Sequence, residues 1–286
     1  MGSPRPTKRR RVSISDDVNR LATPPSNNDS TPPSAQPKDH HPNHQGEDTL
    51  LTRATHILAT EALALTNLTT LYATSPQAHQ SLASAVRAIT TAHSAHGKLL
   101  ACGVGKSAYI AQKLVATCKS LSIRASYMHA CEALHGDLGD IQDRDVLLFV
   151  SFSGRTAELL ALLPHVPDSV TVIALTGVTR VSDCALLRGR QSSVLLPAPI
   201  SEREEESFGV AAPTTSTTVA LAVADMLALT VAGKLHGSRT REVFKRNHPG
   251  GAIGMKHREL ESLKASGEDF TVVELPSPSL SGSDDC

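Results

Sequence analysis

Apolar residues in the first part of the chain recur with helical spacing. Between residues 50 and 71 they stand three or four positions apart, at Leu51, Ala54, Leu58, Ala62, Leu65 and Leu68. This periodicity predicts a helix. Ser75 and Pro76 then offer an N-cap and a favoured first-turn proline for a second helix. We expect that helix to run to about His96 and to stop at Gly97.

Beyond residue 98, short unbroken apolar runs alternate with segments of helical spacing. Runs of this kind are typical of strands that are buried on both faces. We expect strands at 99–102, 124–128, 146–150, 170–175 and 192–196. Helices are expected at 106–120, 157–165, 181–187 and 214–235, with an irregular segment or a single helical turn at 129–140. The alternation predicts an α/β fold with a parallel sheet and right-handed crossovers.

The two ends of the chain have a different composition. Residues 1–46 are rich in Pro, Ser, Asn, Asp and His, and they hold too few large apolar groups to offset the entropy of ordering. We therefore divide the chain into a disordered tail at 1–46, a folded domain at 47–254 and a short, partly disordered tail at 255–286. The cluster Lys8-Arg9-Arg10-Arg11 is either a solvated basic patch or a nuclear import signal. We expect a cytoplasmic protein, with a nuclear location as the alternative.

Charge and composition exclude some classes of partner. The chain has 28 Lys plus Arg and 28 Asp plus Glu, and it has no Trp, so no nucleic-acid partner is expected. Its five cysteines form no CxxC pair, which predicts a reduced intracellular protein without a metal site. The longest apolar run, residues 219–231, is too short to span a bilayer and contains Asp225, so no membrane partner is expected.

A loop rich in hydroxyl groups follows the expected strand at 146–150. Ser151, Ser153, Gly154 and Thr156 stand there, directly before a helix. Unpaired N–H groups at a helix start favour an anion such as phosphate. Ser and Thr also cap helices in the absence of any ligand, so both interpretations stay open.

A glycine-rich segment follows the first expected strand. Gly103, Gly105 and Ala108 match the permissive dinucleotide pattern G-x-G-x-x-A, but a lone match is weak evidence. The segment is not a Walker A loop, because Leu100 stands where that motif has its first glycine. Lys106 begins the next helix, where the helix dipole disfavours a cation. This misfit favours a contact with phosphate or a sugar hydroxyl over a solvated lysine.

Three further residues could carry acid–base chemistry. His135 lies in a loop of ionisable residues and glycines, where it could open a sugar ring or simply hold the loop. Glu158, one turn into a helix, is either a general base or a carboxylate favoured by the helix dipole. His248 belongs to the turn NHPGG, which either presents it to a site or ends a helix.

Taken together, these segments resemble the sugar isomerase (SIS) domain and, within it, the arabinose 5-phosphate isomerases. The resemblance covers about residues 50–254. It rests on the segments GVGKSAYIAQKLVAT, HACEALHGDLG, SFSGRTAELLALLP, IALTG, APTTSTTVALAVADMLA and NHPGGAIG, which occur in this order.

The resemblance implies a three-layer sandwich with a five-stranded parallel sheet, in a dimer or tetramer that completes its sites across subunit interfaces. It implies cofactor-independent isomerisation of D-arabinose 5-phosphate and D-ribulose 5-phosphate through ring opening and an enediol. The family's catalytic residues match Lys106, His135, Glu158 and His248. Its phosphate- and sugar-binding positions match Gly105, Ser107, Ser151, Ser153, Gly154 and Thr156.

The chain also departs from that family. Phe152 and Arg155 replace the usual Asn and Glu of the serine loop, which leaves the substrate open. Bacterial members carry paired CBS domains after HPGG, whereas about thirty residues follow here, so we expect none. The acidic run at 201–206 is expected to be a solvated loop. The alternative functions are a non-catalytic regulatory protein that binds a phosphosugar and, on weaker grounds, a dinucleotide enzyme.

Overall fold

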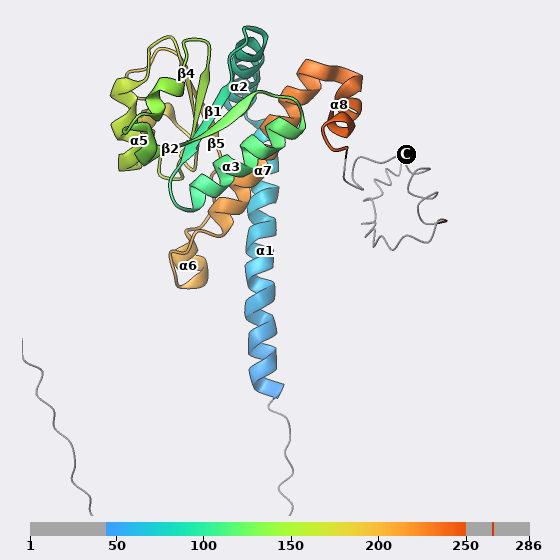
Figure 1. Cartoon of the computed structure of the whole chain (residues 1–286). Coiled ribbons are helices and arrows are strands. Elements are labelled where there is room, and N and C mark those ends of the chain that lie inside the picture. Colours follow the sequence, from blue (N-terminus) through green and yellow to red (C-terminus); the bar gives the residue numbers. More distant parts are fainter. Residues whose placement is uncertain (1–43, 250–264, 266–286) are drawn as a thin grey trace, which may run out of the picture. The chain divides into compact units, whose positions relative to one another are not determined.

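The computed structural model describes residues 44–249 and residue 265 (Figure 1). The chain divides into two compact units, Met1–His44 and Gln45–Cys286, and the fold described below belongs to the second. The expected N-terminal tail with its basic cluster lies outside the described residues, except for the first turn of a helix that begins at His44. The expected C-terminal tail lies outside them apart from residue 265.

Five parallel strands form one sheet in the order β2-β1-β3-β4-β5. This confirms the predicted fold class. All five strands lie within about two residues of the predicted ranges: β1 Leu99–Gly103, β2 Ala125–His129, β3 Val146–Val150, β4 Thr171–Thr176 and β5 Ser193–Pro197. Strands β1 and β3 are buried along their whole length because helices cover both faces of the sheet.

The long helices also follow the predicted pattern. Ser75 caps α2, where its Oγ accepts a hydrogen bond from the backbone N–H of Ala78. The α-helices are α1 His44–Thr74, α2 Pro76–Ser94, α3 Lys106–Ser120, α4 Ala130–Ala133, α5 Ala157–Leu162, α6 Glu204–Phe208, α7 Thr215–His236 and α8 Thr240–Arg246. The 3-10 turns are η1 Asp137–Asp140, η2 Leu163–His165, η3 Val181–Asp183, η4 Ala185–Leu187 and η5 Gly237–Arg239. The predicted helix at 181–187 is therefore wrong, because two separate 3-10 turns occupy it.

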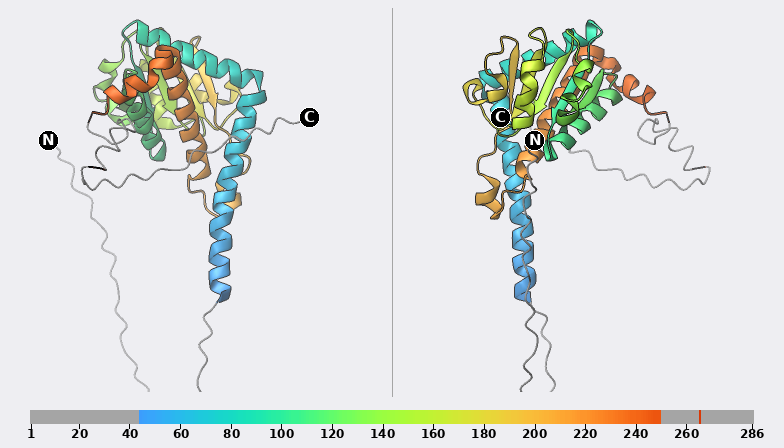
Figure 2. Two further views of the ribbon diagram at one scale, coloured as in Figure 1. Left: turned by 90° about the vertical axis from the view of Figure 1, so that its right-hand side faces the viewer. Right: turned by 60° about the vertical axis from the view of Figure 1, so that its left-hand side comes forward.

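Two apolar cores lie on the two faces of the sheet. On one face, α3 and α7 pack against each other and α2 packs against α7 and β5, with Leu114, Val219 and Leu227 fully buried between them. On the other face, Leu159 and Leu162 of α5 pack with Phe149 of β3. Figures 1 and 2 show the sheet between these helices, which gives the three layers that the resemblance implied.

Helix α7 is the most apolar helix of the described chain. The segment 215–246, which begins with this helix, is long and apolar enough to cross a membrane by length and composition only, although the run at 219–231 is by itself too short. Its buried residues, however, pack into the protein core. Asp225, within the apolar run, pairs with Lys113 of α3. These contacts are those of a core helix in a layered α/β domain.

Helix α1 projects beyond the sheet at its N-terminal half (Figures 1 and 2). Its C-terminal half is anchored, since Ala64 and Leu68 are buried and the Tyr72 hydroxyl donates to the Pro197 carbonyl at 3.0 Å. In the projecting half, Leu50, Leu51 and Leu58 are each about two-thirds exposed.

Candidate functional site

The carboxyl ends of the strands meet along one edge of the sheet. Gly103 at the end of β1 is in register with His129 of β2 on one side and Val150 of β3 on the other. Val150 is in turn in register with Leu175 of β4. Because neighbouring strands lie about 5 Å apart, the loops after β1, β2, β3 and β4 emerge side by side. All the predicted site residues except His248 belong to these loops or to the helices that follow them.

A cavity of about 640 Å³ opens at this edge, between the loops and the N-terminal end of α7. Its volume lies in the range of sites that enclose a small molecule. Three predicted site residues line it: Lys106, Ser107 and Ser153. The APTTSTT segment adds Pro213, Ser216 and Thr217, and the remaining lining includes the apolar side chains Val104, Phe152, Val178 and Ile200.

Lys106 is the first residue of α3, and its side chain is exposed. Gly105 precedes it as the N-cap with a φ of 59°, a left-handed conformation that favours glycine. The glycine therefore serves the turn that sets Lys106 at the cavity. In the described part of the chain, no carboxylate lies within ion-pair distance of this ammonium group. The ammonium group of Lys106 is thus available to bind an anion at the start of α3. The sequence predicted such a contact because a cation at a helix N-terminus is disfavoured by the helix dipole.

The hydroxyl groups of the serine loop bond mainly within the loop. Ser151 is buried, and its Oγ lies 2.7 Å from Thr156 Oγ1. The Oγ of Ser153 accepts a hydrogen bond from the Arg155 backbone N–H at 3.2 Å. Thr156 occupies the N-cap position of α5, but its side chain makes no capping hydrogen bond. The capping interpretation therefore does not account for Thr156, while Ser151 and the buried Gly154 shape the loop without lining the cavity.

Glu158 and His135 lie at the same edge but outside the cavity lining. Glu158 is exposed in the first turn of α5, the helix on the opposite face of the sheet from α3. His135 is exposed in the loop between α4 and η1, and its backbone N–H donates to the Glu132 carbonyl at 2.9 Å. Both side chains therefore lie at the carboxyl edge of the sheet, where the site was predicted, but they do not contact Lys106.

His248 is separated from the other predicted catalytic residues. Its Nε2 lies 3.3 Å from Ser120 Oγ, and its Nδ1 lies 2.8 Å from the Phe244 carbonyl, while its ring stacks on that of Phe244. Ser120 ends α3, fourteen residues after Lys106. At 1.5 Å per residue the two ends of this helix are about 21 Å apart. A single chain therefore does not bring His248 to the cavity.

The acidic run at 201–206 is only in part the solvated loop that we expected. Glu202, Arg203, Glu205 and Glu206 are exposed, but Glu204–Glu206 begin α6, and Glu204 and Glu205 line the cavity. Glu204 Oε1 accepts hydrogen bonds from the backbone N–H groups of Thr214 and Ser216 at 2.7 and 2.9 Å, and from Ser216 Oγ at 2.7 Å. This carboxylate caps α7, which is favourable at a helix N-terminus. Sequence reasoning missed it because no short-range motif joins Glu204 to a helix that begins eleven residues later.

The cysteines of the described region are free thiols. Three of them, Cys102, Cys118 and Cys184, are buried, whereas Cys131 is exposed. Burial raises the pKa of Cys102, at the end of β1, to about 12. A thiol with so high a pKa is a poor nucleophile at neutral pH, so Cys102 serves packing. Within residues 44–249, no three His, Cys, Asp or Glu side chains gather as metal ligands.

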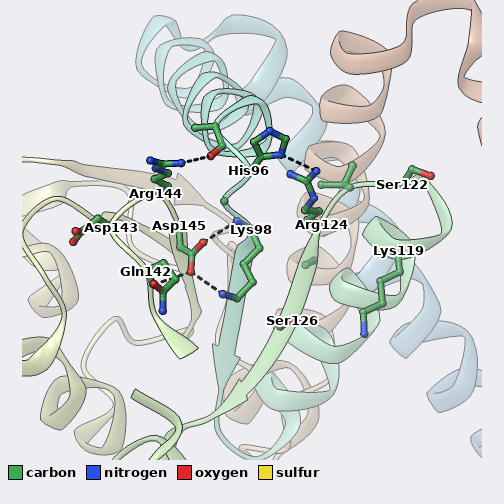
Figure 3. Close-up of a pocket in the computed structure, with 14 residues that line it drawn as sticks. His96, Lys98, Lys119, Ser122, Arg124, Ser126, Gln142, Asp143, Arg144 and Asp145 are labelled. Atoms are coloured by element: carbon green, nitrogen blue, oxygen red, sulfur yellow. Dashed lines mark hydrogen bonds and ion pairs between the residues drawn. The ribbon is translucent and has the colours of Figure 1, made fainter. Parts of the chain in front are cut away.

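A second cavity, of about 770 Å³, lies at the opposite, amino edge of the sheet (Figure 3). Apart from Lys119, and from Asp143, whose carboxylate accepts from Ser169 Oγ, its charged groups bind one another or the backbone. The carboxylate of Asp145 accepts from the Lys98 backbone N–H and from Lys98 Nζ, at 2.8 and 2.9 Å. Arg124 and Arg144 donate to the carbonyls of His93 and Ala95 at the end of α2. These contacts close helix ends and strand starts, so we assign this cavity a structural role.

Comparison with known proteins gives a consistent family relationship. A family model for the SIS domain matches residues 93–230. The chain is 39% identical over 172 residues to the arabinose 5-phosphate isomerase GutQ of Salmonella typhi, a match that spans 60% of this chain and 51% of that protein. It is 38% identical, with the same coverage, to GutQ of Escherichia coli K12. The chain thus spans about half the length of the curated relatives it matches.

One solved structure is matched by this chain over nearly the whole of the solved protein's length. It is the protein c3406 of E. coli CFT073, in complex with a sugar phosphate, and it is 31% identical to this chain with a TM-score of 0.59. The match covers 71% of this chain and 98% of that one. The sequence match and the fold therefore both place the chain in the SIS domain family.

Proposed function

Because the chain belongs to the SIS domain family, we propose that it is a cofactor-independent isomerase of sugar phosphates. We further propose D-arabinose 5-phosphate and D-ribulose 5-phosphate as its substrate pair. The observation that carries the proposal is the cavity at the carboxyl edge, where Lys106 and Ser107 begin α3 beside Ser153 of the serine loop. Sequence identity to two GutQ proteins supports the choice of substrate.

The cavity lining suits a phosphorylated ligand. Lys106 supplies a positive charge to the cavity, while Ser107 and Ser153 supply hydroxyl groups that can donate hydrogen bonds to a phosphate. The backbone N–H groups of the first turn of α3 add the positive end of a helix dipole. A phosphate held here would leave the sugar carbons near the mouth of the cavity, at the edge where Glu158 and His135 stand.

The isomerisation requires a proton to move between C1 and C2 of an open-chain sugar. In our proposal, Glu158 is the base that takes the proton from the carbon, which forms an enediol. Lys106 stabilises the negative charge that develops on the neighbouring oxygen. A histidine opens the ring by proton transfer between ring oxygen and hydroxyl, and His135 and His248 are the two candidates. No step in this sequence requires an external electron acceptor, because the oxidation of one carbon balances the reduction of the other.

We propose that His248 acts in the site of a second copy of this chain. Its distance from Lys106 excludes a role in its own chain's cavity without refolding of α8. The exposed leucines of α1 offer an apolar surface that association of two copies would cover. We expect a homo-oligomer, a dimer or a tetramer, in which each cavity receives His248 from a neighbour.

The test is turnover of D-arabinose 5-phosphate to D-ribulose 5-phosphate by the purified full-length chain, with Glu158→Gln as the variant. Loss of a general base costs about 100- to 10,000-fold in kcat, and we expect a decrease in this range with little change in KM. Thr156→Ser, which keeps the N-cap hydroxyl of the same helix, serves as a control for local structure. Undiminished turnover by Glu158→Gln would exclude it as the base.

Absence of turnover by the wild type would reject the arabinose 5-phosphate proposal. Thermal stabilisation by a panel of sugar phosphates would then separate two outcomes. Stabilisation by another aldose phosphate, with turnover of that sugar, would keep the isomerase and change its substrate. Stabilisation without turnover would favour a regulatory protein that binds a phosphosugar, since ligands that bind only the folded state raise the melting temperature.

A further inference from the structure

Phe152 stands at the cavity in a position fixed by its own backbone. Its carbonyl accepts hydrogen bonds from the Gly177 backbone N–H at 2.9 Å and from Thr176 Oγ1 at 3.0 Å. These two bonds tie the loop after β3 to the end of β4. The ring lies at the cavity lining and remains 43% exposed, although it is a large apolar group. An exposed aromatic side chain that is held in place is available for contact with a ligand.

The ring packs directly on the Gly177 backbone. A Cβ at residue 177 would lie 2.3 Å from Phe152 Cε2 and 2.7 Å from its Cδ2, so the ring occupies the space that a side chain would need. Any larger residue at 177 would displace the ring. Phe152 and Gly177 therefore form a matched pair, although 24 other residues separate them in the sequence.

Val178 and Ile200 also line the cavity, together with this ring. None of these three side chains can donate or accept a hydrogen bond. An amide at residue 152, such as the Asn that the resemblance leads one to expect, could bind a sugar hydroxyl there. The phenyl ring cannot, and it offers van der Waals contact to carbon and hydrogen atoms instead.

We propose that Phe152 is a specificity-determining residue, which allows the cavity to accept sugar phosphates that carry an apolar group in place of a hydroxyl on the side facing the ring. This rests on the proposed function for the class of ligand. Sites that hydrogen-bond a hydroxyl reject an analogue that lacks it by large factors, whereas an apolar wall discriminates weakly. The wild type should therefore bind a sugar phosphate that lacks this hydroxyl about as tightly as one that carries it. A polar residue at position 152 should instead favour the sugar that carries the hydroxyl.

The experiment measures binding rather than turnover. Dissociation constants are determined by calorimetry for D-ribose 5-phosphate and its 2-deoxy and 3-deoxy analogues. The proteins are the wild type, Phe152→Asn and Phe152→Leu. Leu keeps an apolar wall and is the matched control. Gly177→Ala displaces the ring without adding a hydrogen-bonding group, and melting temperatures check that each variant folds.

For at least one pair of hydroxylated and deoxy sugars, we expect Phe152→Asn to shift the affinity ratio about tenfold toward the hydroxylated sugar, the size of one hydrogen bond. Phe152→Leu should keep the wild-type ratio. Ratios within threefold of the wild type for every pair in Phe152→Asn would overturn the proposal. So would equal shifts in the Asn and Leu variants, because ring volume alone would then decide. A failure of arabinose 5-phosphate turnover leaves this test intact, whereas absence of binding by every sugar phosphate would reject both proposals.

Discussion

The position of His248 makes a prediction that separates a site within one chain from a site shared by two. The variants are Lys106→Ala, which removes the cation at the cavity, and His248→Ala, which removes the imidazole at the far end of α3. About 21 Å separates these two ends of the helix, whereas proton transfer requires contact at about 3 Å. Each variant alone should lose nearly all turnover.

A mixture of the two inactive variants should regain activity. In a randomly assembled oligomer from equal amounts, about one quarter of the sites receive an intact Lys106 from one copy and an intact His248 from its neighbour. We therefore expect about one quarter of the wild-type kcat. If Lys106 and His248 acted within the same chain, no combination of these variants would restore a complete site.

The assay is conversion of D-arabinose 5-phosphate by variants that are coexpressed with different affinity tags. Activity is measured on the whole unselected pool, and purification of an aliquot over both tags shows that mixed oligomers have formed. A mixture of wild type with the double variant Lys106→Ala/His248→Ala is the matched control. It should retain about one quarter of full activity for a shared site and about one half for a site within one chain. Mixed oligomers without recovered turnover would refute the shared site.

Two further predictions concern stability. Glu204→Gln should lower the free energy of unfolding by about 0.5–2 kcal/mol in urea denaturation, because the charged cap of α7 is lost; an equal effect of Glu205→Gln, which has no such bonds, would contradict this. Asp145→Asn should cost about 1–3 kcal/mol, since the buried carboxylate accepts from Lys98 and Gln142. Burial lowers the pKa of Lys98, but Asp145 and Asp140 outweigh it and raise that pKa above its usual value. The pair's contribution is thus complete below about pH 10 and lost as pH rises through the raised value, so Asp145→Asn should flatten the alkaline loss of stability. The exposed Asp143→Asn is its control, and identical alkaline profiles in all three proteins would contradict the assignment.

The sheet could be predicted from the sequence because its strands are buried on both faces. Every residue of strands β1 and β3 is buried, so each strand appears in the sequence as an unbroken apolar run. The 3-10 turns η3 and η4 and the helix α8 have no comparable signal, since none of η3, η4 and α8 buries a long apolar row. The predicted helix at 181–187 was wrong for this reason.

The site was predictable only where a local motif carries it. Lys106 was predicted from its place at a helix start, Ser153 from the hydroxyl-rich loop and Ser107 from the family resemblance, and all three line the cavity. Glu204 and the pairing of Phe152 with Gly177 depend on contacts between loops that are distant in the sequence. Periodicity and motif spacing contain no information about such contacts. Hence the acidic run was assigned to solvent although Glu204 caps the core helix.

Association with a second copy of the chain would account for two features of the single chain: the exposed leucines of α1 and the distance of His248 from the cavity. Leu50, Leu51, Leu58 and Leu63 of α1 are 58–70% exposed, and full burial of such a side chain is worth about 1.5–3 kcal/mol. A contact that covered all four would contribute several kcal/mol to association before its entropic cost. His248, at the opposite end of α3 from Lys106, likewise needs a neighbour to take part in the reaction. If the same association covers the α1 leucines and brings His248 to a neighbour's cavity, turnover and the burial of α1 should rise over the same range of protein concentration. The stability of the assembly would then determine how many sites are complete.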